Sequence, residues 1–99
     1  MEAVRLQLPA ELTHAQARAC AQALSAQINA ASASRLDVDA SALVTFDSSA
    51  LAVLLDCRRA ALAAGKSLAV AGLPPGLLAM SRLYGVQALL VPEGAAPVG

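Results

Sequence analysis

Short apolar strands alternate with helical segments along this chain, and that order limits the fold more than any other feature of the sequence. Alternating apolar and polar residues are typical of half-buried strands, and apolar residues three and four apart are typical of helices. These patterns predict strands over residues 4–8, 35–39, 68–72 and 86–91 and helices over residues 13–30, 49–64 and 76–84. The order β-α-β-α-β-α-β favours a sheet with helices packed against it.

Residues that commonly begin and end helices stand at the ends of the predicted helices. Thr13 and Gln16 have the spacing of a capping box, in which the threonine accepts from the backbone and the glutamine reaches back. Gly65 is suited to end the second helix. Pro74 and Pro75 suit a loop that enters the third helix at its first turn.

The size and charge of the chain indicate a single domain that binds proteins. Ninety-nine residues fit one compact domain, and 25 of them are alanine, concentrated in residues 15–33 and 50–64. Phe46 and Tyr84 are the aromatic residues, too few to stack on single-stranded nucleic acid. Seven Lys and Arg balance seven Asp and Glu without a basic stripe, which argues against nucleic-acid binding.

The sequence also predicts the cellular compartment. Glu2 and Arg5 lie in an alternating pattern at the N-terminus, which differs from a targeting signal. The sequence contains no run of about 18 apolar residues, the length that a membrane-spanning helix needs. Cys20 and Cys57 could pair in an oxidising compartment, whereas buried free thiols are the ordinary interpretation. We therefore expect a cytoplasmic protein without direct membrane insertion.

The residue types favour a protein with no enzymatic activity, cofactor or metal. His14 is the only histidine and is expected on an exposed first turn of a helix. The Cys and His residues lack metal-ligand spacing, and no G-x-x-x-x-G-K-S/T motif for nucleotide phosphates is present. Ser48 and Ser49 have no base near them in sequence, so a hydrolytic triad is not expected.

A polar junction separates residues 43–46 from the alanine-rich helix that follows. Asp47, Ser48 and Ser49 stand there in a row. Asp47 or Ser48 is suited to be the N-cap, whose side-chain oxygen accepts from a backbone N–H. Capping needs only one such residue. Because a helix N-terminus favours negative charge, the alternative is that Ser48 or Ser49 is a phosphorylation site that changes the surface without unfolding the helix.

The helix that begins at this junction carries two apolar stripes. One is expected to face the sheet and consists of Ala50, Val53, Leu54, Cys57 and Ala61. The other consists of Leu51, Leu55 and Leu62, with Arg58 at its edge. Together they cover about 200°, about twice the width that docking on one sheet needs. Either neighbouring helices cover the second stripe, or it forms part of a protein-binding face.

Together these segments resemble the STAS domain, which is shared by anti-sigma-factor antagonists and the cytoplasmic tails of sulphate transporters. The likeness covers about residues 4–91 and is carried by DSSALAVLL at the junction, AAGK before the next strand and the late stretch LYGV. The resemblance implies a single STAS-like α/β domain over residues 1–91. It would have a small mixed β-sheet of about four strands, with helices packed mainly on one face. Residues 92–99 are expected to form a flexible tail.

The length of the chain and the lack of fused domains are similar to MlaB-type proteins, which are small cytoplasmic subunits of the ABC transporter that moves phospholipids to maintain outer-membrane lipid asymmetry. The resemblance implies a non-enzymatic accessory subunit that binds and regulates the transporter ATPase and is associated with the inner membrane through it. Ser48 matches the hydroxyl that contacts the ATPase. The expected partner-binding residues are Asp47, Ser48, Ser49, Leu51, Leu55 and Arg58.

The alternative that the resemblance implies is an anti-sigma-factor antagonist. In that group the anti-sigma kinase phosphorylates a serine or threonine of the D-S/T motif, and only the unmodified form binds the kinase. Ser48 matches this residue, with Ser49 as its rival. This chain has Ala50 where antagonists usually have glycine. The alanine methyl group is expected to limit close approach of a kinase to the backbone.

Overall fold

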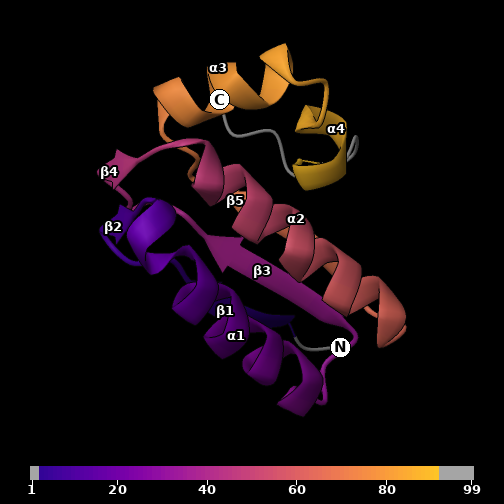
Figure 1. Ribbon diagram of the computed structural model, residues 1–99. Coiled ribbons are helices and arrows are strands. Elements are labelled where there is room, and N and C mark those ends of the chain that lie inside the picture. The colour runs from indigo at the N-terminus through magenta and orange to yellow at the C-terminus, as the bar shows by residue number, and fades with distance from the viewer. Residues whose placement is uncertain (1–2, 92–99) are drawn as a thin grey trace.

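The computed structural model describes residues 3–91, and its elements follow the predicted alternation of strands and helices (Figure 1). In chain order they are β1 (Ala3–Gln7), β2 (Glu11–Leu12), α1 (His14–Ala30), β3 (Arg35–Asp39), β4 (Thr45–Phe46), α2 (Ser48–Ala63), β5 (Ser67–Ala71), α3 (Pro75–Leu83) and α4 (Gln87–Leu90). The predicted α/β fold class is confirmed. The tail predicted over residues 92–99 lies outside the described residues.

Two small parallel sheets form the strand layer. The main sheet has the strand order β1-β3-β5, and the short strands β2 and β4 pair separately. All three strand pairings are parallel, whereas the sequence predicts a mixed sheet of about four strands. The parallel arrangement follows from the connections, because α1 carries the chain from β1 to β3 and α2 carries it towards β5. A helical crossover of this kind returns the chain to the same end of the sheet.

The last predicted strand, over residues 86–91, is a helix. α3 ends at Leu83, and Gly85 takes a φ of +73°, the left-handed conformation that commonly ends helices. Gln87–Leu90 then form α4, which contacts α2, α3 and β5. Leu90 is fully buried in these contacts. A short apolar run is compatible with a buried strand or a buried helix, and here packing against α2 decides between them.

α1 and α2 cover one face of the main sheet (Figure 1). The alternate strand residues on this face are buried and include Leu6, Leu36, Val38, Leu68 and Val70. Residues between them, such as Arg5 and Asp37, lie on the opposite face. The α2 stripe from Ala50 to Ala61 is buried, as predicted for the stripe that faces the sheet.

Both cysteines are free thiols within the helical layer. Cys57 is buried on α2, and its burial raises the pKa of the thiol to about 12. Cys20 is half-buried on α1, where burial also raises its pKa. Thiols with raised pKa values carry little thiolate at neutral pH, so neither cysteine is activated as a nucleophile.

The turn after α2 holds the C-terminus of α1 in place. Gly65 has a φ of +73°, and the Lys66 N–H donates to the Ala61 oxygen at 2.8 Å. This turn directs the Lys66 ammonium to the carbonyl oxygen of Ile28, at 2.7 Å, and to that of Ala31. Carbonyls at the end of a helix lack intrahelical partners, and the helix dipole favours a positive charge there.

Replacing Lys66 with methionine is expected to lower the free energy of unfolding by about 1–3 kcal/mol, because both carbonyls lose a charged donor. Urea denaturation followed by circular dichroism measures this change. Arg59→Met is the control, since Arg59 forms an exposed ion pair with Asp56 and should contribute less than about 1 kcal/mol. Equal losses in the two variants would contradict the role assigned to Lys66.

Candidate functional site

The polar junction lies at the carboxyl ends of the strands, where α1 and α2 begin side by side (Figure 1). β2 pairs with β4 in the register Glu11↔Thr45 and Leu12↔Phe46. This pairing holds together the two chain segments that lead into the helices. The first turns of α1 and α2 therefore lie at the same end of the molecule, although they belong to separate parts of the chain.

Asp47 joins these two helix N-termini. Its Oδ1 accepts from the backbone N–H of Ser49 at 2.8 Å, so Asp47 is the N-cap of α2. Its Oδ2 accepts from the backbone N–H of His14, the first residue of α1, at 3.2 Å. The sequence leaves open whether Asp47 or Ser48 caps α2, and the structure assigns the cap to Asp47. The same carboxylate also satisfies one of the free N–H groups of α1.

The two N–H groups favour the charged form of Asp47. The backbone N–H of Ser49 is the main cause that holds the pKa of this carboxyl below its ordinary value, and the N–H of His14 adds to the effect. A carboxylate whose pKa is lower in the folded chain than in the unfolded chain stabilises the fold at neutral pH. That contribution disappears as the pH falls through the folded-state pKa.

Replacing Asp47 with asparagine is therefore expected to destabilise the domain at pH 7, and the difference from the unmodified protein should shrink as the pH is lowered below about 4. Asparagine keeps an oxygen acceptor but not the charge. Urea midpoints measured across this pH range test the prediction. Asp56→Asn, on the exposed side of α2, controls for the loss of a surface carboxylate. A difference that does not change with pH would contradict the proposed charge effect.

The two serines of the junction differ in exposure. Ser48 is the first residue of α2 and is exposed, whereas Ser49 is half-buried and uses its backbone N–H to bind Asp47. Because Ser48 lies at a helix N-terminus, the partial positive charge of the helix end is close to its hydroxyl. Of the two hydroxyl groups, that of Ser48 is the more accessible to another protein.

The next two residues of α2 turn into the core. Ala50 is fully buried, so a partner at the surface reaches neither its methyl group nor its backbone. Leu51 is only 3% exposed and belongs to the same core cluster. The expectation that Leu51 lies on a binding face is therefore wrong. A side chain so deeply buried cannot contact a partner unless the domain opens.

Neighbouring helices cover part of the second apolar stripe of α2. α3 and α4 both contact α2, which agrees with the first of the two interpretations of the wide apolar arc. Leu55 and Arg58 are half-buried beside them, and Leu55 packs against the core. Leu62 remains at the surface and is 53% exposed. Leu55 and Arg58 can offer only part of their side chains to a partner.

Two residues that the sequence does not assign to the site lie beside it. His14 is exposed and bound to Asp47 through its backbone, and Val44, three residues before Asp47, is 75% exposed. The contact between His14 and Asp47 joins distant parts of the chain, so no local pattern reveals it. The capping box at Thr13 is a signal that could have found it, since helices that follow parallel strands begin at the same edge of a sheet.

A shallow groove continues from the junction between α1 and α2. Its volume is about 280 Å³, and its lining consists of Ala17, Arg18, Ala21, Gln22, Ala52, Val53 and Asp56. Ala52 lies one turn beyond Ser48, so the groove extends the accessible surface along the two helices. Three of these residues are alanines, and Arg18 and Asp56 supply one charge of each sign.

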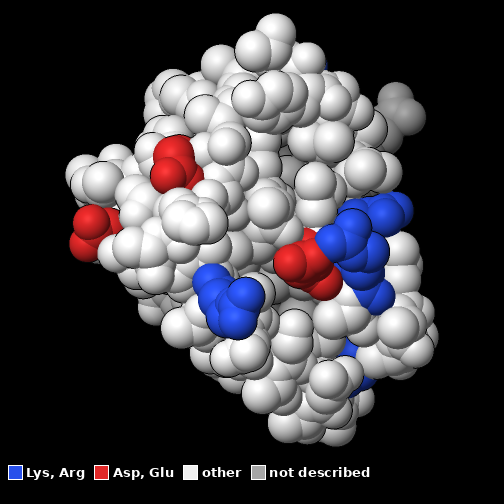
Figure 2. Space-filling model, viewed as in Figure 1, with Lys and Arg blue, Asp and Glu red and all other residues white. Residues whose placement is uncertain are grey.

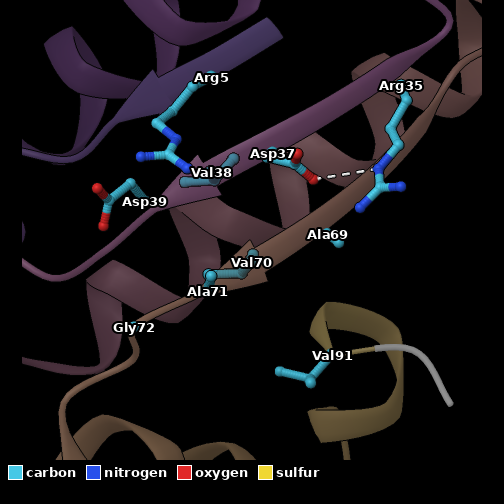
Figure 3. A pocket seen from close by; sticks show the side chains of 10 residues that line it. All are labelled: Arg5, Arg35, Asp37, Val38, Asp39, Ala69, Val70, Ala71, Gly72 and Val91. Carbon is cyan, nitrogen blue, oxygen red and sulfur yellow. Dashed lines mark hydrogen bonds and ion pairs between the residues drawn. The ribbon is translucent and has the colours of Figure 1, made fainter. Parts of the chain in front are cut away.

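A second hollow, of about 350 Å³, lies on the opposite face of the main sheet (Figure 3). Arg35 pairs with Asp37 at 3.4 Å, and Arg5 points towards Asp39. Hydrogen bonds from the Ser41 side chain and backbone are the main cause that holds the pKa of Asp39 below its ordinary value. These positive and negative side chains compensate one another, which leaves little charge to select an ionic ligand.

The face formed by α1 and α2 carries few charged side chains, and most of its surface is uncharged (Figure 2). A surface of this kind is suited to protein contacts, because little charge must be desolvated when it is covered. Within residues 3–91, none of the helices has the length and apolar character needed to cross a membrane.

The chain has a small parallel sheet with helices on one face and an exposed hydroxyl at the start of α2. These features agree with the α/β domain class that the sequence resembles. The family model described as "Mlab, STAS domain" matches residues 1–92. The chain therefore belongs to the STAS domain family, in its MlaB type, and the resemblance stated from the sequence is confirmed. No curated protein matches the chain.

Proposed function

We propose that this protein is a non-enzymatic accessory subunit that binds and regulates the ATPase of an ABC transporter for phospholipids, and so supports outer-membrane lipid asymmetry. Membership of the MlaB type of STAS domain supports this function. The protein would act in the cytoplasm and reach the inner membrane through the transporter. Its contribution would be to stabilise or regulate the assembled ATPase.

The observation that carries the proposal is the exposed hydroxyl of Ser48 on a rigid helix start. The docking surface, defined as His14, Val44, Asp47, Ser48 and Ser49, combines this hydroxyl with an exposed valine and an exposed histidine. The hydrogen bonds of Asp47 to Ser49 and His14 fix the starts of α1 and α2 relative to each other. A preorganised surface binds with a smaller loss of conformational entropy than a flexible one. Leu55 and Arg58 would contribute at its margin.

Copurification tests the proposed partner. The tagged chain, expressed in its native host at its normal level, is expected to retain the ATPase subunit of an ABC transporter together with its permease. Mass spectrometry identifies the retained proteins, and ATP hydrolysis by the purified complex with and without this chain measures regulation. Retention of a serine kinase in place of the ATPase would overturn the transporter function.

The exposure of Ser48 also keeps the anti-sigma-factor antagonist as a second candidate. Ser48 is exposed, so its hydroxyl is accessible to a kinase. In this case Ser48, or its rival Ser49, would gain one phosphate after incubation with the cognate kinase and ATP. Intact-mass analysis, with Ser48→Ala as the control, distinguishes the two functions.

A further inference from the structure

The two outer strands of the main sheet, β1 and β5, each have one edge without a neighbouring strand within residues 3–91, and α4 contacts β5. The order β1-β3-β5 makes β1 an outer strand. The Leu8 N–H donates to the Asp39 oxygen of β3 at 3.0 Å, so the backbone groups of Leu8 point inward. Because these directions alternate along a strand, the N–H and C=O groups of Arg5 and Gln7 point to the open edge. Both residues can therefore form further backbone hydrogen bonds.

The residues of this edge fit a second β1 strand in antiparallel orientation. A two-fold axis at Leu6 would pair Arg5 of each copy with Gln7 of the other. The backbone N–H and C=O groups of Arg5 and Gln7 would then all be hydrogen-bonded on each chain. The same register places the Arg5 charge opposite a neutral side chain, whereas pairing Arg5 with itself would set like charges face to face. Proline and bulges, which commonly block such edges, do not occur within Ala3–Gln7.

The flank of α1 beside this edge is also suited to a second copy. Ala17 and Ala21 line the groove with α2, which identifies the side of α1 that faces α2. The flank turned away from α2 is uncharged and its residues are exposed: Ala19, Ala23, Ala26, Gln27 and Ala30. Small side chains allow two helices to approach closely.

The spacing of the layers agrees with this arrangement. α1 is the crossover between the parallel strands β1 and β3, and a crossover helix packs over the two strands that it connects. Joining two copies at β1 would therefore separate the two α1 helices by about two strand spacings, roughly 9.6 Å. Packed helices lie about 8–10 Å apart. Pairing of the strands thus brings the two alanine-rich flanks into contact.

We propose that two copies of this chain associate through the open edge of β1 and the adjacent flank of α1. They form a continuous six-stranded sheet with all helices α1 and α2 on one face. This interface is separate from the docking surface, which lies at the starts of α1 and α2, so one protein could use both.

Arg5→Pro tests the proposal directly. Proline removes an N–H that points away from β3, and such a position on an edge strand tolerates proline. Arg5→Ala is the matched control, because it removes the same side chain and keeps the N–H. Light scattering on size-exclusion fractions, from micromolar to millimolar protein, should give the mass of two chains for the unmodified protein and Arg5→Ala. It should give the mass of one chain for Arg5→Pro.

A second variant covers the case in which Arg5→Pro fails to fold. Ala23→Glu adds a charge to the exposed flank of α1 and should also give single chains, while Asn29→Glu, an exposed change nearer α2, should leave the pair intact. Single chains of the unmodified protein at every concentration would overturn the proposal. Pairs that persist in Arg5→Pro and Ala23→Glu would overturn it as well. These measurements use the chain alone, so their outcome is independent of ATPase binding.

Discussion

Replacing Ser48 with glutamate is expected to weaken binding of the ATPase subunit by about tenfold to a hundredfold, or about 1.4–2.8 kcal/mol. The new carboxylate would lie next to Asp47 and would have to be desolvated when the docking surface is covered. The domain itself should stay folded, because Ser48 is exposed and an acidic residue is favourable in the first turn of a helix. Surface plasmon resonance with immobilised ATPase measures the change.

Two control variants make the Ser48 result specific. Ser48→Ala removes the hydroxyl without adding charge and should weaken binding by less than Ser48→Glu. Ser67→Glu makes the same chemical change at an exposed serine at the start of β5, the opposite end of the sheet, and should not alter binding. Equal losses of ATPase binding in Ser48→Glu and Ser67→Glu would show that net charge, and not position, governs the interaction.

Replacing Leu54 with alanine is expected to lower the free energy of unfolding by about 3 kcal/mol. Leu54 is fully buried between α2 and the sheet, so truncation leaves a cavity as well as losing apolar burial. In a domain of this size the whole stability is roughly 5–15 kcal/mol, so this one change removes a large share of it. Urea denaturation gives the difference.

Leu62→Ala is the matched control for Leu54. It makes the same change on the same helix, but Leu62 is 53% exposed and its truncation should cost less than about 1 kcal/mol. Helix propensity changes equally in the two variants, so their difference reports packing alone. Similar losses at both positions would contradict the assignment of Leu54 to the core and Leu62 to the surface.

The elements with strong periodic patterns could be predicted from the sequence. The stripe from Ala50 to Ala61 and the helix stop at Gly65 depend on neighbours along the chain, and both appear as expected. The strand predicted over residues 86–91 is wrong, because an apolar-rich run of six residues is too short to show a period. Contact with α2, which is distant in sequence, makes it a helix.

The candidate site could be predicted only in part for the same reason. Capping by Asp47 is local and follows from residue type, whereas its bond to His14 depends on the pairing of β2 with β4. The burial of Leu51 depends on the placement of α3 and α4. A helical projection can define apolar stripes, but it cannot show which of them another helix covers.

The claim that a partner protein contacts the starts of α1 and α2 can be tested by nuclear magnetic resonance. An isotope-labelled chain is titrated with the ATPase subunit, and the backbone amide signals are followed residue by residue. We expect the signals of His14, Ser48 and Ser49 to shift or broaden first, while those of Ser34 and Ser67 stay unchanged. Changes confined to Ser34, Ser67 and their neighbours, with the helix starts unaffected, would contradict the account.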